Sequence, residues 1–172
     1  MFKKILVTVD GSANARRAAE TAAKLAATCG AHLRILHVAP AYLSLDEVET
    51  APMYGDLPQD VRDEMKKLHD TVAGLEFSAF GPIPAPQSAI DFIGNSLLEQ
   101  AESNARGHGC NDVSTVLAYG NAPERIIEEA EHAKADLIVL GSRGLGEVGG
   151  LVLGSVSHKV IQHATCPCLT VK

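Results

Sequence analysis

The sequence contains the stretch Leu137-Ile138-Val139-Leu140-Gly141-Ser142-Arg143-Gly144, and Gly154-Ser155 follows after nine further residues. The first four residues are all apolar, as expected for a strand covered on both faces. The glycines let the backbone turn tightly and approach a ligand without a Cβ in the way. We predict that Ser155 caps the following helix and that Ser157 adds a second hydroxyl donor. The stretch 141–157 therefore predicts a phosphate cradle, because a loop and a helix start in this order expose N–H groups to an anion.

Strands and helices alternate along most of the chain. Apolar, β-branched runs predict strands over 5–9, 33–38, 113–118, 137–140 and 168–171. Helical spacing of apolar residues predicts helices between Ser12 and Gly30 and over 88–106, 122–134 and 155–163. Ser114 and Thr115 make one strand less apolar, which predicts a sheet edge. The alternation predicts a single α/β domain with an open parallel sheet and helices on both faces.

Residues 40–87 interrupt this rhythm. Six of the eight prolines fall in this range, together with a predicted short helix over 59–73. We interpret the acidic run Asp46-Glu47-Val48-Glu49 as a solvated loop rather than a metal site. The range is therefore expected to be an enlarged insertion in one domain spanning 1–172.

Composition and charge exclude several classes of function. The chain has 172 residues, 46% of them hydrophobic and 21% charged, with no Trp and 4% aromatic residues, so a base-stacking surface is not expected. A net charge of −6 gives no general attraction for nucleic acid or for an anionic membrane, so a phosphate ligand must be small and held by local geometry. No apolar run approaches the roughly eighteen residues of a membrane span, and the N-terminal run is too short for a signal sequence. We expect a cytoplasmic protein with four reduced cysteines, of which Cys166 and Cys168 serve packing rather than metal binding.

A glycine-rich loop of this kind could instead be a Walker loop, a dinucleotide fingerprint or a coincidence of composition. A Walker loop needs a Lys after its second conserved glycine, and Gly154-Ser155-Val156 has none. The pattern Gly144-Leu145-Gly146-Glu147-Val148-Gly149 matches the fingerprint formally, but it follows the fourth strand rather than the first. An acidic residue about twenty positions later is also missing.

The chain resembles the universal stress protein family, in the branch that binds ATP. The family motif is glycine, two residues, glycine, nine residues, glycine and then Ser or Thr, and it matches at Gly141, Gly144, Gly154 and Ser155 without a gap. The first strand with Asp10-Gly11-Ser12 and the ending Pro167-Cys168-Leu169-Thr170-Val171 also resemble the family. The resemblance implies a Rossmann-like fold similar to the adenine nucleotide alpha hydrolases, with strand order 3-2-1-4-5. It also implies a homodimer through the strand 168–171.

The same resemblance implies an ATP site with Mg²⁺. Asp10 would lie beside the ribose or a metal ion, and the backbone of Val38 would contact adenine. The residues expected around the nucleotide are Thr8, Val9, Asp10, Ser12, Val38, Gly141, Ser142, Arg143, Gly144, Gly154, Ser155, Val156 and Ser157. Thr8 departs from the family pattern, in which many ATP-binding members carry proline. Arg143 and Lys159 flank the cradle and either neutralise phosphate charge or remain solvated.

These inferences favour a regulatory, stress-response protein that holds ATP and signals through its dimer or through an unidentified protein partner. Two alternatives remain open. One is slow ATP hydrolysis or autophosphorylation, with Ser155 or Ser157 as acceptor and Asp10 holding the metal. The other is a nucleotide-free interaction module in which 40–87 forms the partner site. No residue is an evident catalytic base, so no catalytic residue is assigned.

Overall fold

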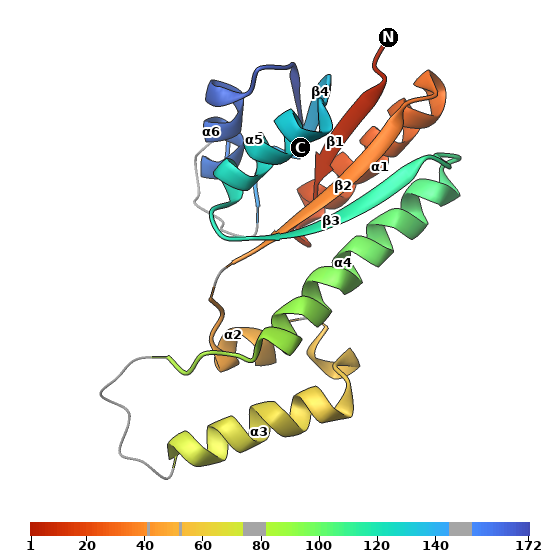
Figure 1. Cartoon of the computed structure of the whole chain (residues 1–172). Coiled ribbons are helices and arrows are strands. Elements are labelled where there is room, and N and C mark those ends of the chain that lie inside the picture. Colours follow the sequence, from red (N-terminus) through yellow and green to blue (C-terminus); the bar gives the residue numbers. More distant parts are fainter. Residues whose placement is uncertain (41, 52, 74–81, 145–152) are drawn as a thin grey trace.

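The sheet has five parallel strands in the order β3-β2-β1-β4-β5, as expected (Figure 1). The computed structural model describes residues 1–40, 42–51, 53–73, 82–144 and 153–172. The strands are β1 (Lys4–Thr8), β2 (His32–Ala39), β3 (Val113–Tyr119), β4 (Leu137–Gly141) and β5 (Cys168–Val171). β3 lies at one edge of the sheet, in agreement with its polar residues.

Helices cover both faces of the sheet. α1 (Ala13–Cys29) and α4 (Gln87–Gly107) pack on one face, while α5 (Ala122–Ala133) and α6 (Ser155–His163) pack on the other. Successive side chains of a strand point to opposite faces, so Ile5 and Val7 join the core under α1, whereas Leu6 joins the core under α5. This explains why the central strands read as continuous apolar runs rather than as alternating ones.

The connections change face between β1 and β4. α1 leads from β1 to β2 on one face, and α6 leads from the neighbouring β4 to β5 on the other. A crevice therefore opens where the loops after β1 and β4 depart in opposite directions. The loops that carry Asp10 and Gly141 lie on the two sides of this crevice.

α1 lies close to the sheet because its packed face is made of alanines. The buried residues of the helix are Ala15, Ala18, Ala19, Ala22, Ala23 and Ala26. Ser12 caps the helix by accepting a hydrogen bond from the N–H of Ala15, and Gly30 ends it in the left-handed conformation with φ of 63°. Both ends agree with the sequence prediction.

The insertion 40–87 contains α2 (Leu45–Glu49), the 3-10 helix η1 (Tyr54–Asp56) and α3 (Gln59–Ala73). The interpretation of the acidic run as a loop was wrong, because Ser44 and Glu47 form a capping box that starts α2 and Val48 is buried. The two hydrogen bonds from Ser44 also lower the pKa of Glu47. Figure 1 shows α4 reaching from this insertion to the sheet.

The insertion has its own apolar core. Val48 and Met65 are completely or almost completely buried, at 0% and 1% exposed. The buried residues of this cluster are Leu45, Val48, Leu57, Val61, Met65 and Ala89, the last of which belongs to α4. The insertion is therefore packed onto the domain through the first turn of α4.

Among the helices in the described part of the chain, none combines the length and the hydropathy required to cross a membrane.

We predict that Met65→Ala lowers the free energy of unfolding by about 2 to 5 kcal/mol, because it leaves a cavity in the core of the insertion. Urea denaturation followed by circular dichroism measures this loss. Lys66→Ala, at an exposed position of the same helix, is the control and should change stability by less than about 0.5 kcal/mol. Equal effects of the two substitutions would contradict the burial of Met65.

Candidate functional site

The backbone at the end of β4 packs directly against the backbone at the start of α1. A Cβ on Gly141 would lie 2.9 Å from the backbone nitrogen of Ala15 and 3.0 Å from the backbone carbon of Asn14. No side chain fits there without moving one of the two elements, so glycine is required for close approach rather than for an unusual φ. The glycine that begins the predicted cradle thus holds the loop against α1.

The loops after β1 and β4 meet at Asp10 and Gly144. A Cβ on Gly144 would lie only 2.6 Å from Oδ2 of Asp10. Oδ1 of Asp10 accepts a hydrogen bond of 2.9 Å from the N–H of Ser12, across Gly11 with its φ of 83°. This short turn fixes the carboxylate at the crevice, and its second oxygen faces the glycine loop.

Two further contacts tie the glycine loop together. The hydroxyl of Ser12 lies 3.5 Å from the carbonyl oxygen of Arg143, to which it donates. The N–H of Gly154 donates to the carbonyl of Ser142 at 2.7 Å, so the two ends of the loop are joined directly. Residues 145–152 of this loop lie outside the described part of the chain, and so does most of the dinucleotide pattern 144–149.

The start of α6 differs from the prediction. Gly154, not Ser155, is the N-cap, and it makes no side-chain cap hydrogen bond. The first hydrogen bond inside the helix is donated by His158 to Gly154. The N–H groups of Ser155 and Val156 therefore have no acceptor within the helix, which is the arrangement that attracts an anion.

Ser157 was expected to offer a hydroxyl to a phosphate, and this expectation was wrong. Its side chain is buried, and its hydroxyl donates to the carbonyl of Gly141 at 2.7 Å. This hydrogen bond joins α6 to the end of β4. Ser155, by contrast, is exposed at the start of the helix.

Val9 and Val38 lie on opposite faces of the sheet. The side chain of Val38 packs against the core under α5, and its backbone is paired with Ala118 of β3. Val9 is buried on the α1 face, and its N–H donates to the carbonyl of Leu36 at 2.9 Å. Thr8 ends β1 and is partly buried.

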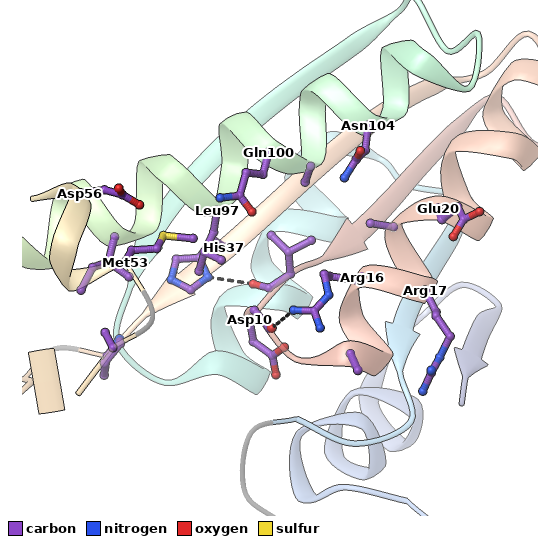
Figure 2. A pocket seen from close by; sticks show the side chains of 18 of the residues that line it. Asp10, Arg16, Arg17, Glu20, His37, Met53, Asp56, Leu97, Gln100 and Asn104 are labelled. Carbon is purple, nitrogen blue, oxygen red and sulfur yellow. Dashed lines mark hydrogen bonds between the residues drawn. The ribbon is translucent and has the colours of Figure 1, made fainter. Parts of the chain in front are cut away.

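A cavity of about 1060 Å³ opens beside Asp10, between α1, α4 and the insertion. Figure 2 shows Asp10 and Arg16 on one wall and Leu97 and Gln100 on the other. The residues that line it are Val9, Asp10, Gly11, Ala13, Arg16, Arg17, Ala19, Glu20, His37, Pro40, Leu43, Glu47, Ala51, Met53, Asp56, Ile93, Leu97, Gln100, Ala101, Asn104 and His108. Of the sequence-predicted residues, Val9 and Asp10 are in this set. Among the glycines of the predicted cradle, Gly144 lies against Asp10.

His37 is a residue of the cavity that the sequence reasoning missed. Its Nδ1 lies 2.8 Å from the carbonyl oxygen of Val9, which can only accept, so Nδ1 carries the proton and Nε2 of the neutral ring is an acceptor. Gly94 of α4 makes room for the ring, because a Cβ there would lie 3.1 Å from His37 Cδ2. Burial lowers the pKa of His37, while the nearby Val9 carbonyl and Asp10 oppose this effect. A histidine directly after the apolar pair Ile35-Leu36 was the available signal.

The cations around the site are exposed. Arg16 donates from Nη1 to the carbonyl of Gly11 at 2.7 Å, and with Arg17 it lines the cavity on the α1 side. Arg143, His158 and Lys159 are also exposed, on the loop and on the first turn of α6. None of these side chains is buried in a way that would require a fixed anionic partner.

The described residues contain no group of three or more His, Cys, Asp or Glu side chains placed to hold a metal ion by themselves. Cys166 and Cys168 pack against the core under α5, and burial is the largest cause that raises the pKa of both thiols. This agrees with the predicted packing role of the two cysteines.

Comparison with known proteins gives one consistent result. A model described as the universal stress protein family matches residues 1–172. The universal stress protein YxiE of Bacillus subtilis and a universal stress protein of Thermus aquaticus are each 32% identical over 172 residues, with all of both chains covered.

Solved structures share the fold. A universal stress protein in complex with cAMP has a TM-score of 0.61 at 23% identity, and 99% of this chain and 97% of that chain are covered. The universal stress protein from Archaeoglobus fulgidus in complex with dAMP has a TM-score of 0.59 at 21% identity, with coverage of 99% and 98%.

We predict that His37 makes stability depend on pH. Because its pKa is lowered in the folded state, the unfolded chain takes up a proton first as the pH falls below the ordinary value of 6.5. The contribution of His37 to stability is therefore complete above that value and is lost as the pH falls from 6.5 towards the lowered pKa. His37→Asn, whose amide can still donate to Val9, should show a flatter fall of Tm between about pH 7 and about pH 5 than the wild type. His69→Asn, at an exposed position of α3, should keep the wild-type slope, and a wild-type slope for His37→Asn would refute the prediction.

Proposed function

Because this chain belongs to the universal stress protein family, we propose that it binds ATP with Mg²⁺ in the crevice between β1 and β4 and signals through a homodimer or a protein partner. The observation that carries the proposal is the approach of Gly144 to Asp10, at a point where a Cβ would collide with the carboxylate. Two loops far apart in the sequence form one site there. The complexes of relatives with cAMP and dAMP support an adenine nucleotide as the ligand.

The phosphates would lie at the start of α6. The N–H groups of Ser155 and Val156 have no acceptor within the helix, and the positive end of the helix dipole favours an anion there. Gly144 and Gly154 keep side chains out of the approach to this point. Arg143 belongs to this loop and would neutralise part of the phosphate charge. The net charge of −6 gives the protein no general attraction for an anion, so such a local cation matters.

The nucleoside would extend from Asp10 into the cavity. Oδ2 of Asp10 would accept a hydrogen bond from the ribose or bind Mg²⁺ together with the phosphates. The wall formed by Val9, His37 and Leu97 offers apolar surface for the base and one acceptor nitrogen. Side chains of the insertion, such as Met53, also line this cavity, so the insertion would cover the ligand.

β5 is proposed as the dimer contact. It is the last strand in the sheet order, so one row of its N–H and C=O groups lacks a neighbouring strand within the described residues. Its side chains are half-buried. Pairing with a second copy of this chain would satisfy that row, because an open strand edge is a template for pairing with another chain.

Isothermal titration with ATP, cAMP and AMP, together with mass spectrometry of nucleotide released from the denatured protein, tests the proposal. ATP should bind and raise Tm. Absence of binding by all three nucleotides would leave only the interaction-module alternative. Release of inorganic phosphate over hours, or a phosphorylated Ser155 found by mass spectrometry, would favour the enzymatic alternative instead.

We predict that Gly154→Val abolishes ATP binding while the protein stays folded and dimeric. A Cβ at this position would lie 3.3 Å from the backbone of Arg143 and 3.4 Å from the carbonyl oxygen of Ser142, so the added branch would push the two ends of the loop apart. Gly107→Val is the matched control, since a Cβ there meets nothing within 4 Å. Unchanged ATP affinity of Gly154→Val would refute the assignment of the cradle.

We further predict that Asp10→Asn weakens ATP binding about tenfold in Mg²⁺ and much less in EDTA, where tenfold corresponds to about 1.4 kcal/mol. The amide oxygen can still accept from the N–H of Ser12, so the turn is kept while the charge is lost. Titrations with and without Mg²⁺ measure the difference. Asp63→Asn, at an exposed position of α3, should change neither titration. An equal loss in both conditions would assign Asp10 to the nucleoside instead of the metal.

A further inference from the structure

At the amino ends of β2 and β3, opposite the nucleotide crevice, three side chains form a continuous chain of hydrogen bonds. Nδ1 of His32 lies 2.8 Å from Oδ1 of Asp112, and Nε2 of His32 lies 2.8 Å from Oγ of Ser114. The two strands are adjacent and in register, with Arg34 opposite Ser114. An acid, a histidine and a serine are thus joined in the order of a catalytic triad.

The direction of these hydrogen bonds follows from their partners. The carboxylate of Asp112 can only accept, so it receives the proton on Nδ1 of His32. In the neutral ring Nε2 is then a lone-pair acceptor, and the hydroxyl of Ser114 donates to it. This is the arrangement in which a histidine can remove the proton of a serine as the serine attacks an electrophile.

The backbone supplies a group to stabilise an oxyanion. The N–H of Leu33 in β2 donates to the carbonyl of Asp112 at 2.9 Å. Because every second residue of a strand directs its N–H and C=O groups to the same side, those of Ser114 also face β2. The residues between them and after them, Val113 and Thr115, direct their N–H and C=O groups to the opposite side of the strand. The N–H of Thr115 therefore faces the free edge of β3, which pairs only with β2 in the described structure. A donor directly after the nucleophile is a familiar component of an oxyanion hole.

The three side chains are accessible. The side chain of Asp112 is 76% exposed and that of His32 is 32% exposed, and Ser114 is partly exposed at the edge of the sheet. An exposed acid polarises the histidine less than a buried one, because water screens its charge. The site is therefore suited to esters with a good leaving group rather than to amides.

We propose that Ser114 is the nucleophile of an esterase site for small, activated carboxylic esters. Oγ of Ser114 attacks the carbonyl carbon while its proton moves to Nε2 of His32, and Asp112 stabilises the resulting imidazolium. The tetrahedral oxyanion faces the N–H of Thr115. When it collapses, the bond to the alcohol oxygen breaks, this oxygen takes the proton from Nε2, and the acyl group stays on Ser114.

Water completes the cycle. Nε2 of His32 removes a proton from a water molecule as its oxygen attacks the acyl carbon. The second tetrahedral intermediate then releases the carboxylic acid, and Oγ of Ser114 recovers its proton from Nε2. The reaction consumes one ester and one water and yields one acid and one alcohol, without any other reactant.

The test uses the full chain and two probes. A fluorophosphonate should form one covalent adduct, located on Ser114 by peptide mass spectrometry, and p-nitrophenyl acetate should be hydrolysed. Ser114→Ala should form no adduct. Its kcat/KM for the ester should fall by at least about 100-fold, which is the rate enhancement that a general base typically provides. Ser103→Ala, at an exposed position of α4, is the control and should behave as the wild type.

The positioning role of Asp112 has a separate readout. Asp112→Asn should lower kcat with little change in KM, because it favours the wrong tautomer of His32 without touching the ester. Absence of an adduct on wild-type Ser114, or equal ester hydrolysis by wild type and Ser114→Ala, would overturn the proposal. Labelling of the wild-type protein does not depend on any variant, so it tests the assignment of Ser114 even if a variant fails to fold.

Discussion

The close packing of α1 on the sheet is the constraint on which the structure depends. Its buried face consists of alanines, so the helix backbone lies near β1 and β4. The start of α1 is thereby placed within 2.9 Å of the position a Cβ of Gly141 would take. A larger residue on either side would separate the loops after β1 and β4. The contact between Asp10 and Gly144, and with it the candidate nucleotide site, follows from small side chains rather than from any strong bond.

Much of the fold could be predicted because it depends on local pattern. Apolar runs and caps such as Ser12 and Gly30 located the strands and helices to within one or two residues, and the family resemblance supplied the strand order. The candidate site was less predictable. His37 and the hydroxyl of Ser157 owe their roles to contacts with residues 28 and 16 positions away, and no spacing in the sequence encodes such contacts. The capping box of α2 was local, but the surrounding prolines obscured it.

The polar side chains of the two candidate sites lie at opposite ends of the strands. The loops after β1 and β4 gather glycines and an acid at the carboxyl ends, where parallel sheets usually bind ligands. The network around His32 lies at the amino ends of β2 and β3, at the opposite edge of the sheet. One sheet therefore presents two chemically different surfaces with a shared apolar interior, and changes in one need not disturb the other.

The hydrogen bonds from Gly154 to Ser142 and from Ser157 to Gly141 close a ring that contains residues 145–152. Both hydrogen bonds connect the end of β4 to the start of α6. The entropy of closing a loop grows only slowly with its length, by about 0.6 kcal/mol for each doubling. Because the two hydrogen bonds fix both ends of the loop, a change in its length would alter the entropy of loop closure by only a fraction of a kcal/mol, so the same cradle could be closed by loops of different lengths.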